Sequence, residues 1–404
     1  MKKVLLVTQM FPPKLGGGPN YYYRLCENLP CDRIVVLADK DDKLKLDLSG
    51  FTPKFKIYYK SFFYKSKLVW PKWFKLLFEL NNVIHEEKPD IIWAGEVIPA
   101  GTVVWFLSRL HNLPYFVSTH GADVLNPQVK PGIKGRWKLF LVRFILRHAD
   151  FNTANTEFTR LQLSKLGVPH ERSIVVYPCP VYVPTNENLL DETQEQSVVV
   201  KIVTDLKKHG YKVLLTAVGH LVKRKGIDSV IEALPKVWQK DQSVAYVVTG
   251  AGPYKSYLEE RAKELDKRVG RSSRIIFTGP VSEQELKFLF SRSDVYIMLP
   301  RIINGLTEGF GIVYIEASSF SKPVIGSRVA GVPEAIVEFY DNNYTKATGL
   351  LVDNVHSTSE VSEKIIMLIK DEHMAYKFGE NGKRWTEKFK WEEQVKILVE
   401  KIRD

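Results

Sequence analysis

Two glutamates flank a short apolar segment in the second half of the chain. Glu308 and Glu316 lie eight positions apart in "LTEGFGIVYIEA", on either side of Gly309 and Gly311. The glycines permit a tight loop, and a helix beginning at about Ile312 would direct its backbone N–H groups at anionic oxygens. Carboxylates accept hydrogen bonds from hydroxyl groups, so the pair could hold a hexose and a ribose. The alternative is a charge at a helix start and a solvent-exposed glutamate.

A basic loop supplies candidates for phosphate binding. "VGHLVKRKGID" contains the consecutive cations Lys223, Arg224 and Lys225, followed by Gly226 before a helical pattern. Fixed positive charge in a water-poor site can neutralise a diphosphate and stabilise it as a leaving group. A solvated basic turn is the alternative interpretation.

A glycine-rich loop follows the first apolar run of the chain. "FPPKLGGGPN" places Gly16, Gly17 and Gly18 before a helix, where backbone N–H groups could approach a phosphate closely. The spacing is not G-x-G-x-x-G, so the dinucleotide-binding fingerprint is absent. A flexible turn between a strand and a helix explains the glycines equally well.

Three further loops after predicted strands carry candidate residues. In "STHGADV", His120 could contact a polar ligand or orient a reacting group, with Asp123 three positions later. "VTGAGPY" and "FTGPVSEQEL", which contain Gly252 and Val281, each end a strand with glycine, as close approach to a nucleotide base would require. A solvated histidine and two plain turns are the alternatives.

The elements that must position these residues follow from a repeated pattern. Apolar runs such as "KVLLVT", "RIVVLA" and "DIIWAG" alternate with helical patterns in the first half, and "KVLLTAVG", "VAYVVTG" and "DVYIML" do so in the second. Alternation of this kind predicts an α/β protein with two doubly wound, Rossmann-like domains facing each other across a cleft. Ligands of such sheets bind beyond the carboxyl ends of the strands.

We predict four segments from this pattern. An N-terminal domain covers residues 1–183, a proline-rich and then polar linker covers 184–197, and a second domain covers 198–384, entered by a helix over 198–209. A C-terminal helix over 385–404 could return to the first domain. A length of 404 residues fits two domains.

Composition narrows the class of protein. With 45% hydrophobic and 26% charged residues, the chain is expected to be globular and soluble. The net charge of +12 favours anionic partners. Cys26, Cys31 and Cys179 are odd in number and have no metal-ligand spacing, and no apolar run is long enough for a signal peptide or a membrane span. We therefore expect a location in the reducing cytoplasm.

Residues 51–78 suggest a further partner. They contain lysines interleaved with aromatic residues and no acidic residue, a composition that suits the surface of an anionic membrane and thus a lipid-linked acceptor. A basic face with its aromatic rings in the core is one alternative. Binding of single-stranded nucleic acid is another, but no RNA-binding motif accompanies the segment, and no nucleic-acid partner is expected.

The motifs together resemble a known family. "HGAD", "GHLVKRKG", "EGFGIVYIE" and "AGVPEAI" are similar to the GT4 family of retaining glycosyltransferases with the GT-B fold, and the resemblance covers nearly the whole chain. It implies transfer of a hexosyl group from a UDP- or GDP-hexose to a lipid-linked or glycan acceptor. The donor would bind the second domain and the acceptor the first, without a metal ion or other cofactor. With such a lipid-linked acceptor, we expect a peripheral membrane protein on the cytoplasmic face of the membrane.

The resemblance also implies a role for each matching residue. Glu308 would bind the donor sugar hydroxyls and Glu316 the ribose, while His120 would contact the sugar near the reacting carbon. Lys225 and Arg224 would bind the diphosphate. The further donor-binding positions are His220 and a set that would act mainly through backbone atoms: Gly16, Gly17, Gly252, Val281, Phe310, Gly311 and Ile312.

One position departs from the family pattern. Many relatives have Gly-Arg where this chain has Gly219-His220, and a neutral histidine offers neither the permanent charge nor the bidentate fork of arginine. Arg224 in the same loop could compensate. A GT-B-like phosphorylase or epimerase, or a catalytically inactive binding protein, is the alternative function.

Overall fold

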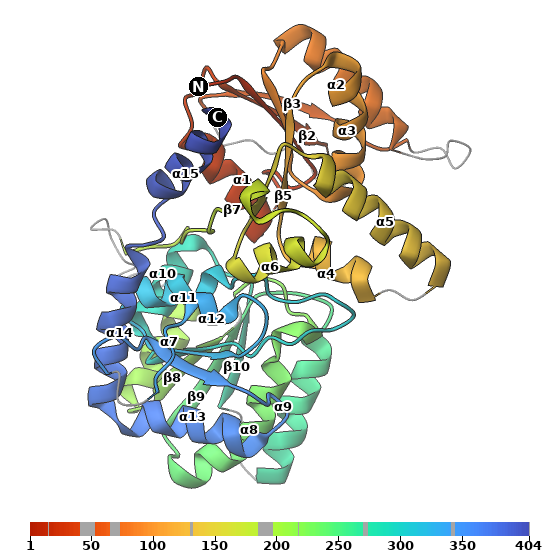
Figure 1. Ribbon diagram of the computed structural model, residues 1–404. Coiled ribbons are helices and arrows are strands. Elements are labelled where there is room, and N and C mark those ends of the chain that lie inside the picture. Colours follow the sequence, from red (N-terminus) through yellow and green to blue (C-terminus); the bar gives the residue numbers. More distant parts are fainter. Residues whose placement is uncertain are drawn as a thin grey trace. The chain divides into compact units, whose positions relative to one another are not determined.

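The computed structural model describes residues 1–14, 16–40, 53–64, 73–129, 132–184, 197–216, 218–269, 274–340 and 344–403 (Figure 1). The chain forms two compact units. Unit 1 comprises Met1–Cys179, Asn304–Gly309 and Phe389–Asp404, and unit 2 comprises Pro180–Ile303 and Phe310–Lys388. Apart from its two end residues, the predicted linker over 184–197 lies outside the described residues.

Unit 1 is built on a parallel sheet of seven strands. They are β1 (Val4–Thr8), β2 (Ile34–Asp39), β3 (Lys56–Lys60), β4 (Ile91–Ala94), β5 (Tyr115–Thr119), β6 (Phe151–Ala154) and β7 (Ser173–Val175). Their order in the sheet is β3-β2-β1-β4-β5-β6-β7. The winding direction therefore changes between β1 and β4, and the loops after these two strands meet at the switch point where ligands of such sheets bind.

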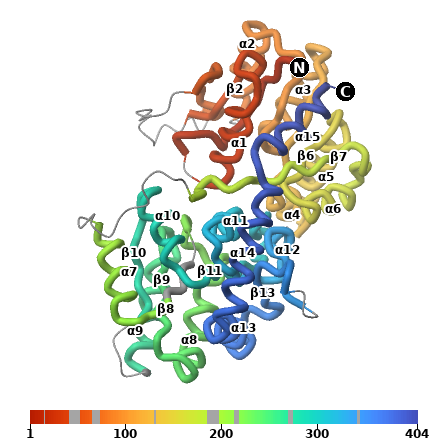
Figure 2. The backbone as a smooth tube through the Cα atoms, turned by 90° about the vertical axis from the view of Figure 1, so that its left-hand side faces the viewer, coloured from red at the N-terminus to blue at the C-terminus, as the bar shows by residue number. Residues whose placement is uncertain are grey.

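Helices cover both faces of this sheet. They are α1 (Gly17–Glu27), α2 (Phe74–Glu87), α3 (Thr102–His111), α4 (Ala122–Val129), α5 (Gly132–His148), α6 (Glu157–Lys165) and α15 (Trp391–Arg403). Side chains of β1 alternate between the two layers, because Leu5 and Val7 pack with α2, α3 and α5 while Val4 and Leu6 pack with α1 and α15. Figure 2 shows α15 beside α1 on the second face.

Unit 2 contains a second parallel sheet, of six strands. They are β8 (Lys212–Thr216), β9 (Val244–Thr249), β10 (Ile275–Gly279), β11 (Val295–Ile297), β12 (Val324–Ser327) and β13 (Gly349–Val352), in the order β10-β9-β8-β11-β12-β13. The switch point here lies between β8 and β11. The sheet is thus doubly wound like the first.

The helices of unit 2 also lie on both faces of their sheet. They are α7 (Val198–Lys208), α8 (Ile227–Lys240), α9 (Lys255–Val269), α10 (Glu283–Arg292), α11 (Ile312–Ser319), α12 (Val332–Ala335), α13 (Thr358–Lys370) and α14 (Glu372–Thr386). Ile297 packs into the core shared with α8, α9 and α13. The neighbouring Tyr296 points the other way and contacts Phe290 of α10 and Tyr314 of α11.

The strand and helix predictions are confirmed, but three strands were missed. Every apolar run predicted as a strand contains one, and the helix expected over 198–209 is α7. In β6, polar residues occupy buried positions because they are hydrogen-bonded: Asn152 Nδ2 donates to Leu146 O at 3.0 Å, and Thr153 Oγ1 lies 2.7 Å from Ser118 Oγ. β3 and β13 were also absent from the prediction, the first because its residues fall in the basic and aromatic stretch.

That stretch, residues 51–78, is described over 53–64 and 73–78. Phe55 and Phe62 are buried in the core of unit 1. Lys56 Nζ forms ion pairs with Glu86 at 3.0 Å and with Glu87 at 2.5 Å, both on α2. For these residues the packing alternative is correct, whereas Phe74 and Phe78 are exposed.

Two further observations concern the predictions from composition. Cys26, Cys31 and Cys179 are unpaired. Within the described parts of the chain, none of the helices combines the length and the apolar character needed to cross a bilayer.

Candidate functional site

The switch point of unit 1 is organised by a glutamate that the sequence analysis missed. Glu96 follows β4, and its carboxylate accepts hydrogen bonds from Thr8 Oγ1 at 2.7 Å, Gln9 N at 2.9 Å and Met10 N at 3.2 Å. These donors stand at the end of β1 and in the loop that leads to Gly16. Burial raises the pKa of Glu96 to about 7, and the three hydrogen bonds oppose that rise. An acidic residue directly after a buried strand was the available sequence signal.

His120 extends from the loop after β5 against two tyrosines of α1. Its Nε2 lies 2.6 Å from Tyr22 Oη, and the rings of Tyr21 and Tyr22 meet the imidazole edge-on, with centroids 5.2 and 5.3 Å away. Burial lowers the pKa of His120 to about 4, so the imidazole is neutral near pH 7.

The hydrogen bonds of Tyr22 determine the tautomer of this histidine. The Tyr22 hydroxyl donates its single proton to the carbonyl oxygen of Gly95. His120 Nε2 must therefore carry a proton and donate to Tyr22 Oη. Nδ1 is then an acceptor, and no described residue donates a hydrogen bond to it. The side chain can therefore accept a hydrogen bond from a ligand hydroxyl group.

Asp123 holds the loop that carries His120. Its Oδ1 accepts a hydrogen bond from the backbone N–H of His120 at 3.0 Å. Its Oδ2 is buried without a hydrogen-bond partner among the described residues, and burial raises the pKa of this carboxyl to about 6. The predicted pair is therefore close in space, with the carboxylate bound to the backbone of His120 rather than to its imidazole.

A segment from much later in the chain packs against the same loop. A Cβ atom at Gly309 would lie 2.8 Å from His120 O and 2.6 Å from Asn155 Nδ2, so only glycine fits. Asn126 Nδ2 also donates to Asn304 O at 2.8 Å. Because Glu308 directly precedes Gly309, unit 1 brings Glu308 and His120 into neighbouring backbone segments.

The glycine loop before α1 is open. Helix α1 begins at Gly17, and no side chain of a described residue caps its first turn. Gly16 and Gly17 are both exposed. The predicted helix is present, but it begins one residue after Gly16, so that Gly17 and Gly18 lie in its first turn rather than before it. Its first backbone N–H groups could still approach an anion.

The basic loop of unit 2 is held by an arginine that was not predicted. Arg301, after β11, donates to Lys223 O at 3.1 Å through Nε and to Asp228 Oδ1 at 2.6 Å through Nη2. Its backbone N–H donates to Arg224 O at 2.9 Å. Lys225 is buried, with 7% of its surface exposed. A solvated basic turn is therefore wrong for Lys225.

Gly226 ends this loop in a conformation that requires glycine. Its φ is +70°, and a Cβ atom there would lie 1.8 Å from Leu299 O. The loop after β8 is thereby packed directly on the residues that follow β11, across the switch point of unit 2.

The loops after β8, β9 and β10 place the other predicted residues of unit 2. His220 is exposed and pairs with Ala251 in a short bridge between two loops. A Cβ atom at Gly252 would lie 2.4 Å from Leu221 O, so this glycine permits close approach of the protein's own backbone, and a nucleotide base is not needed to explain it. Val281 is half-buried between β10 and α10.

Helix α11 begins at Ile312, as predicted, and places Glu316 in the interior. Gly311 precedes its first turn, no side chain caps it among the described residues, and Phe310 is buried. Glu316 is only 4% exposed, so the solvent-exposed alternative is wrong. Its Oε1 accepts hydrogen bonds from Val181 N at 3.1 Å and Tyr182 N at 3.4 Å, and burial raises its pKa to about 7.

Comparisons with known proteins identify the family of this chain. Residues 17–179 match the family described as glycosyl transferase 4-like domain, and residues 201–385 match glycosyl transferases group 1. The chain belongs to the GT4 family of glycosyltransferases. This glycosyltransferase is therefore an enzyme that transfers sugars.

Relatives of the glycosyltransferase match along its whole length. A GDP-mannose-dependent alpha-(1-6)-phosphatidylinositol monomannoside mannosyltransferase from Mycobacterium tuberculosis is 26% identical, covering 100% of this chain and 98% of its own. The corresponding enzyme for the monoacylated substrate from Corynebacterium glutamicum is 26% identical over 97% and 95% of the two chains.

A solved structure confirms the fold. Alr3699/HepE from Anabaena, in complex with UDP and glucose, matches with a TM-score of 0.75 and 19% identity over 100% of both chains. The GT-B fold predicted for the glycosyltransferase is thereby confirmed.

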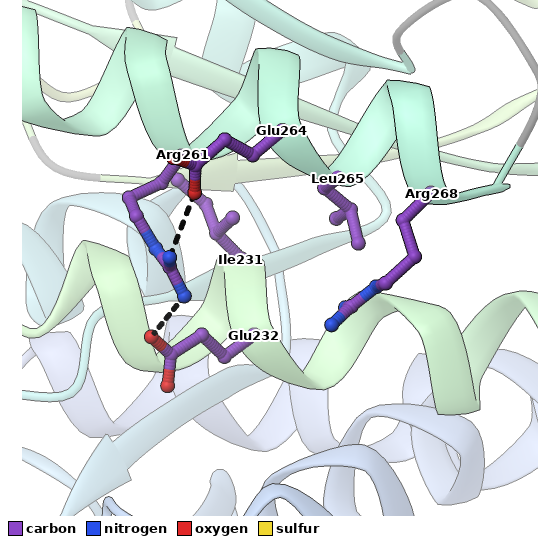
Figure 3. Close-up of a pocket in the computed structure, with 6 residues that line it drawn as sticks. All are labelled: Ile231, Glu232, Arg261, Glu264, Leu265 and Arg268. Carbon is purple, nitrogen blue, oxygen red and sulfur yellow. Dashed lines mark hydrogen bonds and ion pairs between the residues drawn. The ribbon is translucent and has the colours of Figure 1, made fainter.

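A separate crevice of the glycosyltransferase lies outside these loops. Ile231 and Glu232 of α8 and Arg261, Glu264, Leu265 and Arg268 of α9 line it (Figure 3). Arg261 spans it, with ion pairs to Glu264 at 2.8 Å and Glu232 at 3.2 Å. The crevice contains no predicted site residue and is held by its own ion pairs.

In the described part of the chain, no three histidine, cysteine, aspartate or glutamate side chains cluster as metal ligands would.

Proposed function

We propose that this glycosyltransferase transfers a hexosyl group from a UDP- or GDP-hexose to a lipid-linked or glycan acceptor, with retention of the anomeric configuration. The names of its relatives support this proposal, since they specify GDP-mannose and phosphatidylinositol mannosides. The complex of HepE with UDP and glucose supports a nucleotide-sugar donor as well. In this proposal residues 198–384 bind the donor and residues 1–183 the acceptor.

One observation carries the assignment of the donor diphosphate. The loop with Lys225 follows β8, and both Arg301 and the uncapped start of α11 follow the neighbouring strand β11. A buried cation and the N–H groups of a helix start are thus supplied from the two strands that flank the switch point. Both features favour binding of an anionic group.

The reaction would depend on stabilisation of the departing diphosphate. Lys225 and Arg224 would neutralise its charge as the bond to the sugar breaks, and the diphosphate oxygen would accept the proton of the acceptor hydroxyl group. No carboxylate nucleophile and no metal ion are required on this path. His220 lacks the permanent charge of an arginine and would contribute less than Arg224 to this neutralisation.

The remaining residues would bind the sugar and the nucleoside. His120, through Nδ1, and Glu308 would accept hydrogen bonds from hydroxyl groups of the transferred hexose. Glu316 would bind the ribose through the carboxylate oxygen that Val181 and Tyr182 leave unbound. Backbone groups at Gly16, Gly17, Gly252, Val281, Phe310, Gly311 and Ile312 would complete the donor contacts.

Substitution of Lys225 tests this proposal. We expect Lys225→Ala to lower kcat for nucleotide release at least about 100-fold while changing the Kd of the donor less, because the charge acts mainly on the transition state. Lys223→Ala, an exposed position in the same loop, is the matched control and should retain kcat. Equal turnover of the Lys225→Ala and wild-type proteins would remove Lys225 from the mechanism. Absence of donor hydrolysis and transfer in the wild type would favour the inactive binding protein.

A further inference from the structure

Helix α5 of unit 1 has an outer face that the fold does not use. Its inner face packs into the core through Val142, Ile145 and Leu146. On the opposite side, Ile133, Trp137 and Phe140 are 86%, 65% and 56% exposed. Spacings of four and three residues place these side chains on one stripe of the helix. Packing within unit 1 therefore does not explain them.

The exposed apolar surface continues onto two neighbouring helices. Helix α3 packs against both α2 and α5 on the same side of the sheet (Figure 1). It exposes Phe106 and Leu110, and α2 exposes Phe74 and Phe78, in each case one helical turn apart. The ring of Trp105 on α3 meets Phe144 on α5 edge-on, with centroids 4.9 Å apart, so aromatic side chains of these two helices are in contact. Exposed apolar side chains gathered on adjoining helices mark an interaction surface.

Cations accompany the apolar side chains. Helix α5 contains Lys134, Arg136, Lys138, Arg143 and Arg147 and no acidic residue. Lys134, Arg136 and Arg143 are exposed, and none forms an ion pair with a described residue. The lysines of β3 differ, since Lys56 is neutralised by glutamates of α2. The outer face of α5 therefore combines aromatic rings with uncompensated positive charge.

We propose that the outer face of α5, with the adjoining exposed side chains of α2 and α3, is the surface through which this protein lies on an anionic lipid bilayer. Aromatic residues flanked by lysine and arginine suit the boundary between headgroups and acyl chains. In a symmetric dimer formed through this face, the basic α5 helices of the two copies would lie against each other. Repulsion between their like charges disfavours that contact. The surface is separate from the residues assigned to the donor, so the two proposals can fail independently.

Vesicle binding tests this surface. The full-length protein should co-sediment with vesicles containing roughly one-third phosphatidylglycerol in phosphatidylcholine, and far less with phosphatidylcholine alone. We expect Trp137→Ser with Phe140→Ser to weaken partitioning about tenfold or more. Arg136→Gln with Arg143→Gln should weaken it about fivefold for each charge, an effect that added salt diminishes. Tyr376→Ser, at an exposed aromatic position of α14 in unit 2, is the matched control.

Two readouts separate this proposal from its alternatives. Donor hydrolysis in solution and the Tm of the α5 variants should match the wild type, because the substituted side chains are exposed. Binding of the α5 variants to vesicles as tight as that of the wild type, or no binding by the wild type, would overturn the proposal. If the wild type does not bind vesicles but forms a dimer, and Phe140→Ser converts this dimer to a monomer, the outer face of α5 binds a second copy of the chain instead.

Discussion

Replacement of Glu316 by glutamine should raise the stability of the protein and weaken its affinity for the donor. The carboxylate is buried, and its pKa is raised to about 7 from the ordinary value of 4.5. That difference corresponds to about 3 kcal/mol at 25 °C. Glutamine can still accept the hydrogen bonds of Val181 and Tyr182 through its amide oxygen.

The sign of the pH dependence follows from proton binding. Between pH 4.5 and about 7 the unfolded chain has released the Glu316 proton while the folded protein retains it. The stability that Glu316 contributes is therefore fully present below pH 4.5 and is lost as the pH rises towards 7. Glu316→Gln should match the wild type at pH 4.5 and exceed it by up to about 3 kcal/mol at pH 8, a Tm increase of roughly 6–12 °C for a unit of this size.

Two assays on the same variant check this reasoning. Thermal unfolding of both proteins from pH 4.5 to 8 isolates Glu316, because Glu96 and Asp123 titrate equally in each. Titration calorimetry with UDP and GDP should show about tenfold weaker binding by Glu316→Gln, as expected for loss of one charged acceptor to a ribose hydroxyl. A stability difference that does not vary with pH would refute the buried-carboxylate argument. Unchanged nucleotide affinity would separate Glu316 from the ribose.

Two further substitutions test the loops at the switch points. Tyr22→Phe should lower kcat about tenfold with little change in KM, because the imidazole of His120 loses the hydrogen bond that sets its tautomer. If the variant has the same kcat and pH profile as the wild type, Tyr22 does not position His120. Gly226→Ala should lower the free energy of unfolding by about 2–4 kcal/mol in denaturant titrations, since its Cβ would meet Leu299 O. Gly279→Ala, with positive φ but open space, should cost only about 1 kcal/mol, and equal losses would contradict the packing argument.

Much of the fold could be predicted because parallel strands buried on both faces are apolar along their whole length. The beginning of α11 at Ile312 was likewise visible in the glycines before it. β6 was missed because it buries the polar residues Asn152 and Thr153 in place of apolar ones. Their hydrogen bonds, from Asn152 Nδ2 to Leu146 O and between Thr153 Oγ1 and Ser118 Oγ, cannot be inferred from the strand's own sequence.

Residues of the candidate site could be predicted only where a single loop contains all the residues that form the motif. The cations of residues 223–225 and the glutamates of 308–316 are recognisable locally. The roles of Glu96, Tyr22 and Arg301 are not, since each side chain acts on a segment that only the strand order brings near. Glu96 binds the end of β1, Tyr22 binds His120, and Arg301 binds Asp228. Gly252 gave an ambiguous signal, because close approach of one loop to another and close approach to a ligand require the same residue.

Helix α15 has a consequence for how the protein is made. Val395, Leu398 and Ile402 complete the core on one face of the unit 1 sheet, and Gln394 Oε1 accepts a hydrogen bond from Tyr177 N at 2.8 Å. Most of unit 1 leaves the ribosome first, but it lacks part of its interior until α15 has also been synthesised. All strands of unit 2 emerge from the ribosome before α15 does, so unit 2 can fold first. A chain terminated before α15 would leave the unit 1 sheet uncovered on the face where α15 packs, and this exposed apolar surface would favour aggregation.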